Sequence, residues 1–347
     1  MLEVAIKKTL PGGFALDVEF NAGAETMALL GASGCGKSLT LQCIAGVQTP
    51  DEGRITLNGR VLFDSEKRVN LPPQKRKIGY LFQHYALFPN FSVLQNIALG
   101  IGSGTRAEKL FAARNLIAAM HLDGLENRKP HELSGGQRQR AALARALATE
   151  PEALLLDEPF SALDDYLKWQ LELDLADTLR GFRGTAVYVS HSRDEVYRLC
   201  GSVSVLQDGK SEKKRAVRDL FHAPETLSAA LISGCKNYSR AEILPDGRIN
   251  ALDWGIALSA ADEPPEDLKY IGVRAHYIKS CADANAENAV VCRVARDIDD
   301  VFGAVLMLET PGTAQLRAEM PKSARDALGE IENLIVQIDK NDIMLLK

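Results

Sequence analysis

The chain has 347 residues, with 41 lysines and arginines against 46 aspartates and glutamates, which gives a formal net charge of −5. This length favours two domains over one. The composition, 46% hydrophobic and 25% charged, is that of a globular protein, and its slight acidity argues against nucleic-acid binding. No apolar stretch approaches the roughly 18 residues that a membrane span needs.

The N-terminus and the cysteines favour a cytoplasmic protein. The first residues lack the apolar core and the cleavage site of a signal peptide. The six cysteines form no CxxC pair, a pattern that favours reduced thiols over disulfides or a zinc site.

The first predicted elements are two strands, a helix and a hairpin. Residues 14–20 alternate apolar and polar side chains, which is typical of an antiparallel strand. Residues 26–30 are apolar, as in a buried strand. A helix is expected from Lys37 to Gly46. Asn58-Gly59 lies between two apolar runs and predicts a tight hairpin turn.

Later in the first half, helix starts alternate with short apolar runs. The capping-box pattern predicts four helix starts, at Ser92…Gln95, Thr105…Glu108, Ser134…Gln137 and Ser192…Glu195. The apolar runs predict buried strands at 78–82, 153–156 and 185–189. Strands that alternate with helices indicate a parallel α/β core, with antiparallel hairpin structure near the start.

The hydrophobic pattern of the sequence changes near residue 234, where the helical periodicity ends. Short strand-like pieces follow between turn signals; the best strand candidates are 271–274, 290–294, 305–308 and 334–338. We therefore predict a first domain over 1–233 and a small all-β, barrel-like domain over 234–347.

A phosphate-binding loop is the first chemical motif. The pattern G-x-x-x-x-G-K-[ST] is formed by Gly31, Ala32, Ser33, Gly34, Cys35, Gly36, Lys37 and Ser38. Backbone N–H groups of such a loop surround phosphate oxygens at a helix start. Lys37 suits the β- and γ-phosphates as a catalytic group, and Ser38 suits Mg²⁺. The alternative is a chance glycine-rich turn, but the flanking strand and helix favour a nucleotide site.

An acidic pair follows the apolar run 153–156. Asp157 ends the predicted strand at the edge where α/β sheets bind ligands, so it can hold Mg²⁺. Glu158 can orient the attacking water or accept its proton. Alone, this pattern also fits a solvated strand end; the phosphate loop makes it specific.

A second phosphate-binding helix start lies at Leu133–Gln137. It combines a capping serine with unhindered backbone N–H groups, through Ser134, Gly135, Gly136 and Gln137. One site has no need of two such ends from one chain. Two chains facing head to tail, each closing on the nucleotide of the other, would use both.

With Gln83, Ser161–Asp164 and His191, these motifs resemble the ATP-binding-cassette (ABC) ATPases, in that family's order, over residues 1 to about 232. The resemblance implies a P-loop NTPase fold with an antiparallel β subdomain and a helical subdomain, and ATP hydrolysis with ATP and Mg²⁺ as cofactors. It also implies that Gln83 senses Mg²⁺ and the attacking water, that Asp164 lies at the dimer seam, and that His191 contacts the γ-phosphate.

Two positions depart from the family pattern. Leu39, which follows the loop and is counted with the nucleotide-binding residues, stands where many members carry a threonine. Residues 8–12 hold no aromatic side chain to stack on adenine. Phe14 lies nearby, either for that purpose or as a core residue.

The single cassette resembles the ATPase subunits of bacterial importers. That implies a homodimer, two integral-membrane permease subunits, an extracytoplasmic substrate-binding protein, and a place on the inner face of the cell membrane. Residues 82–89 resemble the region that receives the membrane subunit's coupling helix. Tyr85, Leu87 and Phe88 belong either to that surface or to the core.

The combination of a cassette and a small β domain resembles importers for oxyanions, iron, sugars and polyamines. Residues 57–65, 71–74 and 234–237 look most like the molybdate/sulfate branch, with molybdate expected and tungstate or sulfate as alternatives. An iron, sugar or polyamine importer stays open, as does an oxyanion sensor with secondary ATPase activity. A further alternative is a cassette protein that acts on nucleic acid or ribosomes. The sequence disfavours it, because such relatives generally carry two cassettes or long coiled-coil insertions, and neither is found here.

The C-terminal region resembles an oligomer-binding-type (TOBE/MOP-like) domain that in some relatives binds molybdate or regulates transport, so we expect a regulatory or dimerisation domain. Arg274, His276 and Lys236 either contact such an oxyanion or form a solvated strand end in a dimerising domain.

Overall fold

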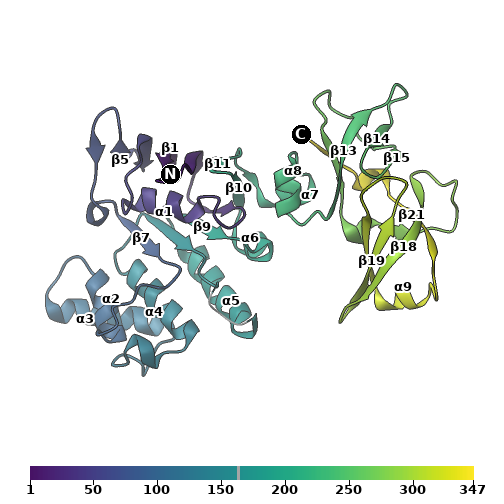
Figure 1. The fold of residues 1–347 in the computed structure, drawn as a ribbon. Coiled ribbons are helices and arrows are strands. Elements are labelled where there is room, and N and C mark those ends of the chain that lie inside the picture. Colours follow the sequence, from purple (N-terminus) through teal and green to yellow (C-terminus); the bar gives the residue numbers. More distant parts are fainter. Residues whose placement is uncertain (162–164) are drawn as a thin grey trace. The chain divides into compact units, whose positions relative to one another are not determined.

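The computed structural model describes residues 1–161 and 165–347, with side chains from residue 168 onward in the second range. The expected dimer-seam residue Asp164 lies outside the described residues. The chain forms two compact units, Met1–Val217 and Arg218–Lys347 (Figure 1). This division comes earlier than the boundary expected near residue 234, because helices α7 (Val217–His222) and α8 (Leu227–Ile232) bond with the second unit.

The first unit contains one twelve-stranded sheet. Its spatial order is β6 (Val69–Asn70), β5 (Arg60–Asp64), β4 (Glu52–Leu57), β1 (Leu2–Thr9), β2 (Ala15–Ala22), β11 (Lys210–Ser211), β10 (Ser202–Gln207), β3 (Thr26–Leu30), β9 (Thr185–Ser190), β8 (Ala153–Asp157) and β7 (Ile78–Leu81), while β12 (Arg215–Ala216) pairs with β10. Neighbours from β10 to β7 run parallel, and β6, β5, β4, β1 and β2 form the expected antiparallel part.

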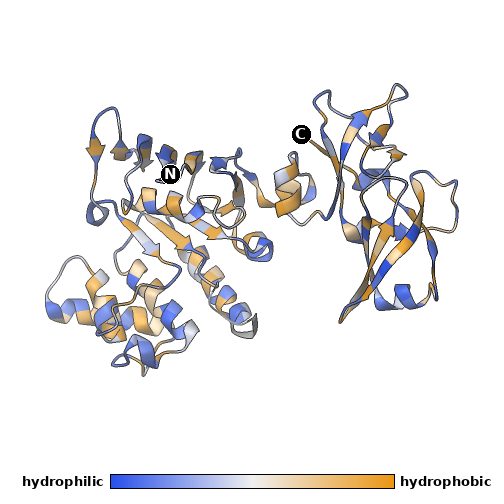
Figure 2. Cartoon of the chain, in the orientation of Figure 1, coloured by the Kyte–Doolittle hydropathy of each residue, from blue (hydrophilic) through white to orange (hydrophobic). Residues whose placement is uncertain are grey.

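The parallel strands read as continuous apolar runs because both of their faces are covered. Every residue of β8 and β9 is buried, and Figure 2 shows these strands in hydrophobic colours. Parallel strands connected through helices have this character. The sheet therefore holds the carboxyl ends of β3, β9, β8 and β7 beside one another, and this edge carries the site described below.

Six helices of the first unit lie in its described part: α1 (Lys37–Ala45), α2 (Val93–Gly100), α3 (Arg106–Ala119), α4 (Gly135–Leu147), α5 (Asp165–Gly181) and α6 (Arg193–Leu199), with 3₁₀ turns η1 (Pro73–Lys75) and η2 (Pro130–Glu132). Helices α2, α3 and α4 share an apolar core of their own and form the expected helical subdomain (Figure 1). None of the described helices is long and apolar enough to cross a membrane.

Local signals placed several of these elements correctly. Ser92, Thr105 and Ser134 each form the predicted capping box. Ser192 also caps its helix, but the side chain of Glu195 bonds elsewhere and leaves that box incomplete. Asn58 and Gly59, with φ of 50° and 77°, make the predicted turn between β4 and β5.

The second unit is the expected barrel-like β domain. One sheet runs β15 (Ile256–Leu258), β14 (Ile249–Ala251), β13 (Asn237–Ile243), β16 (Tyr270–Val273), β22 (Met344–Leu346); the other runs β17 (Lys279–Ser280), β21 (Asn333–Gln337), β18 (Ala289–Asp299), β19 (Gly303–Glu309), β20 (Leu316–Pro321). Helix α9 (Lys322–Asp326) and turns η3 (Ala275–Tyr277) and η4 (Lys340–Asp342) complete it. Both sheets contribute to one core around the fully buried Trp254.

Candidate active site

The predicted phosphate loop connects β3 to α1. A Cβ at Gly31 would lie 2.2 Å from the carbonyl oxygen of Leu206, so a side chain there would collide with backbone. Gly36 has φ of 104°, and its Cβ would meet Leu16 at 2.6 Å. The loop conformation thus depends on glycine at both positions.

The ammonium group of Lys37 lies inside this loop. Its Nζ donates to the carbonyl oxygens of Gly31 and Ala32, both at 2.8 Å, and the residue is only 5% exposed. The loop therefore combines a fixed positive charge with the helix N-terminus, as phosphate binding requires.

Asp157 receives a donor on each carboxylate oxygen. Ser38 Oγ donates to Oδ1 at 2.8 Å, and the hydroxyl of Tyr80 donates to Oδ2 at 3.0 Å. Burial nevertheless raises the pKa of Asp157 above its usual value, because these two donors only partly offset the loss of solvation. Tyr80 was not predicted; it comes to this site because β7 pairs with β8.

The carboxylate of Glu158 contacts two other predicted site residues, Gln83 and His191. Its backbone is left-handed, with φ of 44°. Gln83 Nε2 donates to Glu158 Oε2 at 3.3 Å, and His191 Nδ1 lies 3.4 Å from Oε1. These residues follow β7, β8 and β9, so they meet at the carboxyl edge of the parallel sheet, where such sheets bind ligands.

The residues expected to hold Mg²⁺ suit that ion. Ser38, Gln83 and Asp157 offer hydroxyl, amide and carboxylate oxygens, which are the hard donors that Mg²⁺ prefers. Ser38 and Asp157 lie in direct contact beside the phosphate loop. The site can thus hold a magnesium ion against nucleotide phosphates.

The predicted second phosphate-binding helix start coincides with the N-terminus of α4. Ser134 is exposed and accepts from the backbone N–H of Gln137, while Gln137 Oε1 accepts from the N–H of Ser134. In the described residues, the hydrogen bonds of these two side chains stay within this helix start. Gly136 is buried and Gly135 half-buried. Ser134 is therefore accessible to a second chain.

The departures from the family pattern have a structural outcome. Phe14 and Leu39 are half-buried and pack against the core of the first unit. Ring atoms of Phe14 come within 3.1 Å of an ideal Cβ at Gly36, so the ring packs against the phosphate loop. Phe14 could stack on adenine or pack in the core, and the structure favours core packing.

The segment after β7 divides between core and surface. Tyr85 is buried, and its hydroxyl donates to the carbonyl oxygen of Pro159; Leu87 packs into the helical core. Phe88 is 51% exposed. Arg145 of α4 holds the segment by donating to the carbonyl oxygens of Tyr85 and Ala86.

In the second unit, Arg274 is engaged with backbone. Its guanidinium donates to the carbonyl oxygens of Phe221 and Ser233, at the ends of α7 and α8. Lys236 and His276 are exposed. Arg274 therefore joins the two short helices to β16.

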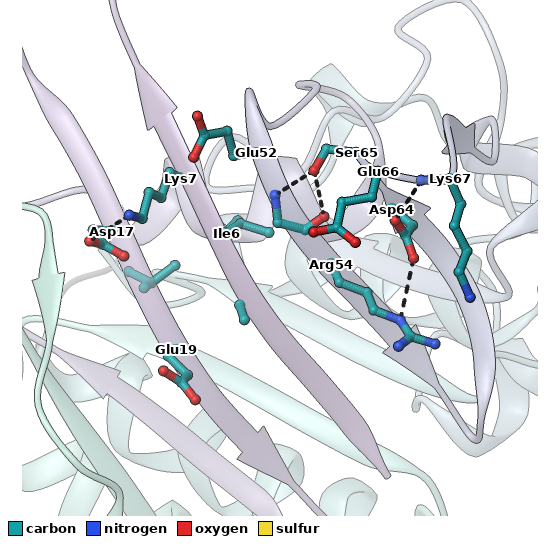
Figure 3. Close-up of a pocket in the computed structure, with 13 residues that line it drawn as sticks. Ile6, Lys7, Asp17, Glu19, Glu52, Arg54, Asp64, Ser65, Glu66 and Lys67 are labelled. Atoms are coloured by element: carbon teal, nitrogen blue, oxygen red, sulfur yellow. Dashed lines mark hydrogen bonds and ion pairs between the residues drawn. The ribbon is translucent and has the colours of Figure 1, made fainter.

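A hollow of about 700 Å³ lies on the outer face of the antiparallel strands and contains none of the predicted site residues (Figure 3). Two ion pairs lie in it: Lys7 is 3.8 Å from Asp17, and Arg54 is 3.6 Å from Asp64. No cluster of three or more potential metal-ligating side chains occurs among the described residues.

Comparison with known proteins agrees with this geometry. Residues 15–161 match the family model described as ABC transporter. The molybdenum import ATP-binding protein ModC of Paramagnetospirillum magneticum is 39% identical in an alignment that covers 82% of this chain and 86% of that protein. The chain belongs to the ABC transporter ATPase family. Cassettes of this family bind ATP, with Mg²⁺ as the usual partner ion.

Other relatives of this ABC ATPase differ in how far they match. ModC of Aliivibrio fischeri is 33% identical over 98% of this chain and 88% of its own length. The Fe(3+) ions import ATP-binding protein FbpC of Haemophilus influenzae is 41% identical, but over 63% of this chain and 62% of its own length. The solved dimeric ATP-binding cassette MJ0796, bound to ADP and Pi, is 28% identical, with a TM-score of 0.54 over 63% of this chain and 99% of that one.

The raised pKa of Asp157 leads to a stability prediction. A raised pKa means that the folded protein binds this proton more tightly than the unfolded chain does. Ionisation of Asp157 therefore lowers the free energy of unfolding as the pH rises above the unfolded pKa of about 3.9, and the loss is complete above the folded pKa. Asp157→Asn removes the charge and keeps groups that can bond Ser38 and Tyr80. Without nucleotide, calorimetry should give a higher Tm for the variant at pH 7 and a smaller difference near pH 4. A variant less stable than wild type at pH 7 would contradict this account.

Proposed function

We propose that this chain is the ATP-hydrolysing subunit of an importer for an oxyanion, with molybdate as the cargo and tungstate or sulfate as related alternatives. The extent of the matches carries this proposal. Two relatives named for molybdenum import match over 82% and 98% of the chain and thus reach into the second unit. The iron relative matches over 63%.

The site residues have separable tasks in hydrolysis. The loop N–H groups and Lys37 bind the phosphates and offset their charge. Glu158 orients the attacking water and accepts its proton, with Gln83 and His191 on its two oxygens. Ser38, Gln83 and Asp157 would hold Mg²⁺, which would supply further charge stabilisation at the phosphates.

Two copies of the chain complete the site. Ser134, Gly135, Gly136 and Gln137 of each copy bind the nucleotide held by the phosphate loop of the other. The exposed start of α4 supports this arrangement, since its N–H groups suit phosphate but lie on a separate subdomain from the loop.

Membrane partners dock on the helical subdomain. Phe88 and Phe91 are 51% and 39% exposed, and their rings lie 5.7 Å apart. The buried Asn96 holds this segment by bonding the carbonyl oxygens of Phe88 and Phe91. An exposed aromatic pair on a rigid segment suits the coupling helix of a permease. The subunit then works on the inner face of the membrane, beneath two permeases that receive cargo from an extracytoplasmic binding protein.

The second unit serves in dimerisation rather than in binding an oxyanion through Arg274. The engagement of Arg274 with the carbonyl oxygens of Phe221 and Ser233 supports this assignment, because the guanidinium best suited to an oxyanion already has partners.

Uptake by cells that produce this protein tests the cargo. Glu158→Gln in the chromosomal copy should lower molybdate accumulation from a scarce medium by about tenfold or more, because hydrolysis drives import. Iron and putrescine uptake should stay at the wild-type level. Glu19→Gln, on the exposed face of β2, is the matched control. Lost iron or putrescine uptake with normal molybdate uptake would replace the oxyanion assignment with that cargo.

A further inference from the structure

Glu195 of α6 is a buried carboxylate next to the loop that carries His191. It is 4% exposed. The hydroxyl groups of Tyr188 and Ser190 each donate to its Oε2 at 2.7 Å, and Lys168 Nζ lies 2.5 Å from its Oε1. Three donors therefore converge on one side chain behind the active site.

These bonds close a ring around His191. Ser190 Oγ, bonded to the Glu195 carboxylate, accepts from the backbone N–H of Ser192 at 2.9 Å. Ser192 Oγ in turn accepts from the backbone N–H of Glu195 at 3.4 Å. The residues on both sides of His191 are thus tied to Glu195, through its side chain and through its backbone.

His191 depends on this backbone for its position. Its side chain is 63% exposed, and Nδ1 lies 3.4 Å from Glu158 Oε1. An exposed imidazole is packed by few neighbours, so the end of β9 and the start of α6 determine where it points. A displacement of about 1 Å in such a group can cost about 10²-fold in rate.

The bonding of Glu195 departs from its local preference. A glutamate three residues after a serine N-cap usually bonds the N-cap N–H and completes a capping box. Here the carboxylate turns into the protein instead, where burying a charge costs free energy unless donors surround it. The donors it meets are Lys168 and the two hydroxyl groups of β9.

We propose that Glu195, held in place by Lys168, is the positioning residue that sets the orientation of His191 for ATP hydrolysis; this inference rests on the proposed function. Lys168 belongs to α5, the helix that follows the Ser161–Asp164 motif in the chain. The ion pair therefore also joins that helix to the loop carrying His191.

A neighbouring ion pair provides the matched control. Glu172 of α5 is 3% exposed and receives Arg198 of α6, with Nε at 2.9 Å and Nη2 at 2.5 Å from Oε2. This pair joins the same two helices, but neither partner hydrogen-bonds Ser190 or Ser192 in the described structure. Its loss should affect stability without moving His191.

The experiment compares Glu195→Gln with Glu172→Gln in the full-length protein. Both variants should lower the Tm, since each leaves a cation without its carboxylate. Glu195→Gln should lower kcat for ATP hydrolysis by about tenfold or more, with KM and ATP affinity within about twofold of wild type. Glu172→Gln should keep kcat within about twofold.

Lys168 variants keep the inference testable if Glu195→Gln does not fold, because Lys168 is 24% exposed. Lys168→Met should lower kcat in the same way, and Lys168→Arg should restore most of it, since arginine keeps the ion pair. Unchanged kcat in the Glu195 and Lys168→Met variants, or equal losses in Glu172→Gln, would overturn the proposal. A wild-type protein that binds ATP without hydrolysing it would instead refute the proposed function.

Discussion

Replacing Glu158 with glutamine should leave ATP binding intact and lower the rate constant of hydrolysis by about 10²–10⁴-fold, the usual contribution of a general base. Glutamine has the same shape as glutamate and can still bond Gln83, but it cannot accept a proton from water. A single-turnover assay of ATP hydrolysis, combined with equilibrium binding of ATP·Mg²⁺, measures the two effects separately.

Lys37→Ala is the comparison for this variant. It removes the ammonium group from the loop, so it should weaken ATP binding as well as hydrolysis. Hydrolysis by Glu158→Gln at the wild-type rate would remove Glu158 from its role, and another residue would then have to activate the water.

Replacing Ser134 with aspartate should abolish hydrolysis while α4 stays folded. Aspartate is as good an N-cap as serine, so the helix start is retained, but it places a negative charge where a phosphate is expected to bind. Two unit charges about 4 Å apart near a protein surface interact by about 4 kcal/mol, or about 10³-fold. Ser134→Asn is the uncharged control, which also caps well and should keep most of the activity.

Mixing variants tests whether two chains share each site. Ser134→Asp and Lys37→Ala should each be inactive alone. Together they form dimers in which the intact loop of one chain faces the intact α4 start of the other, so about a quarter of wild-type activity should return in an equal mixture, given symmetric independent sites. Activity that stays absent in the mixture would contradict sites built from two chains.

The parts of the site that lie in one stretch of chain were predictable. The phosphate loop and the start of α4 act through backbone N–H groups of consecutive residues, so a short pattern contains most of the information about them. The glycines at 31 and 36 were recognised for the same reason, and the structure adds that neighbouring backbone and side chains leave no room for a Cβ.

The parts that depend on strand neighbours were less accessible. The spacing of Gln83, Glu158 and His191 along the chain does not say that three strand ends meet, and only the resemblance to a family grouped them. Tyr80 was missed because its hydroxyl reaches Asp157 across the pairing of β7 with β8. Nothing in the residues around Tyr80 indicates that pairing.

The local capping pattern predicted where the backbone begins a helix, but it did not predict which partners the side chains bond. Ser192 begins a helix as predicted, yet Glu195 does not complete the capping box. One N–H at a helix start competes with two hydroxyl groups and an ammonium group supplied by β9 and α5. Those donors come from distant parts of the chain, so the helical pattern could not reveal them.

The amino-acid sequence was sufficient for the parallel α/β core, the barrel-like second unit and the phosphate-binding chemistry, because these follow from hydrophobic periodicity and from motifs of consecutive residues. The cassette architecture followed from the family resemblance. Only the tertiary structure decided that α7 and α8 belong with the second unit, that Tyr85 is buried while Phe88 is exposed, and that Arg274 bonds backbone. Burial and long-range hydrogen bonds depend on which distant segments pack together, and packing is a property of the folded chain as a unit.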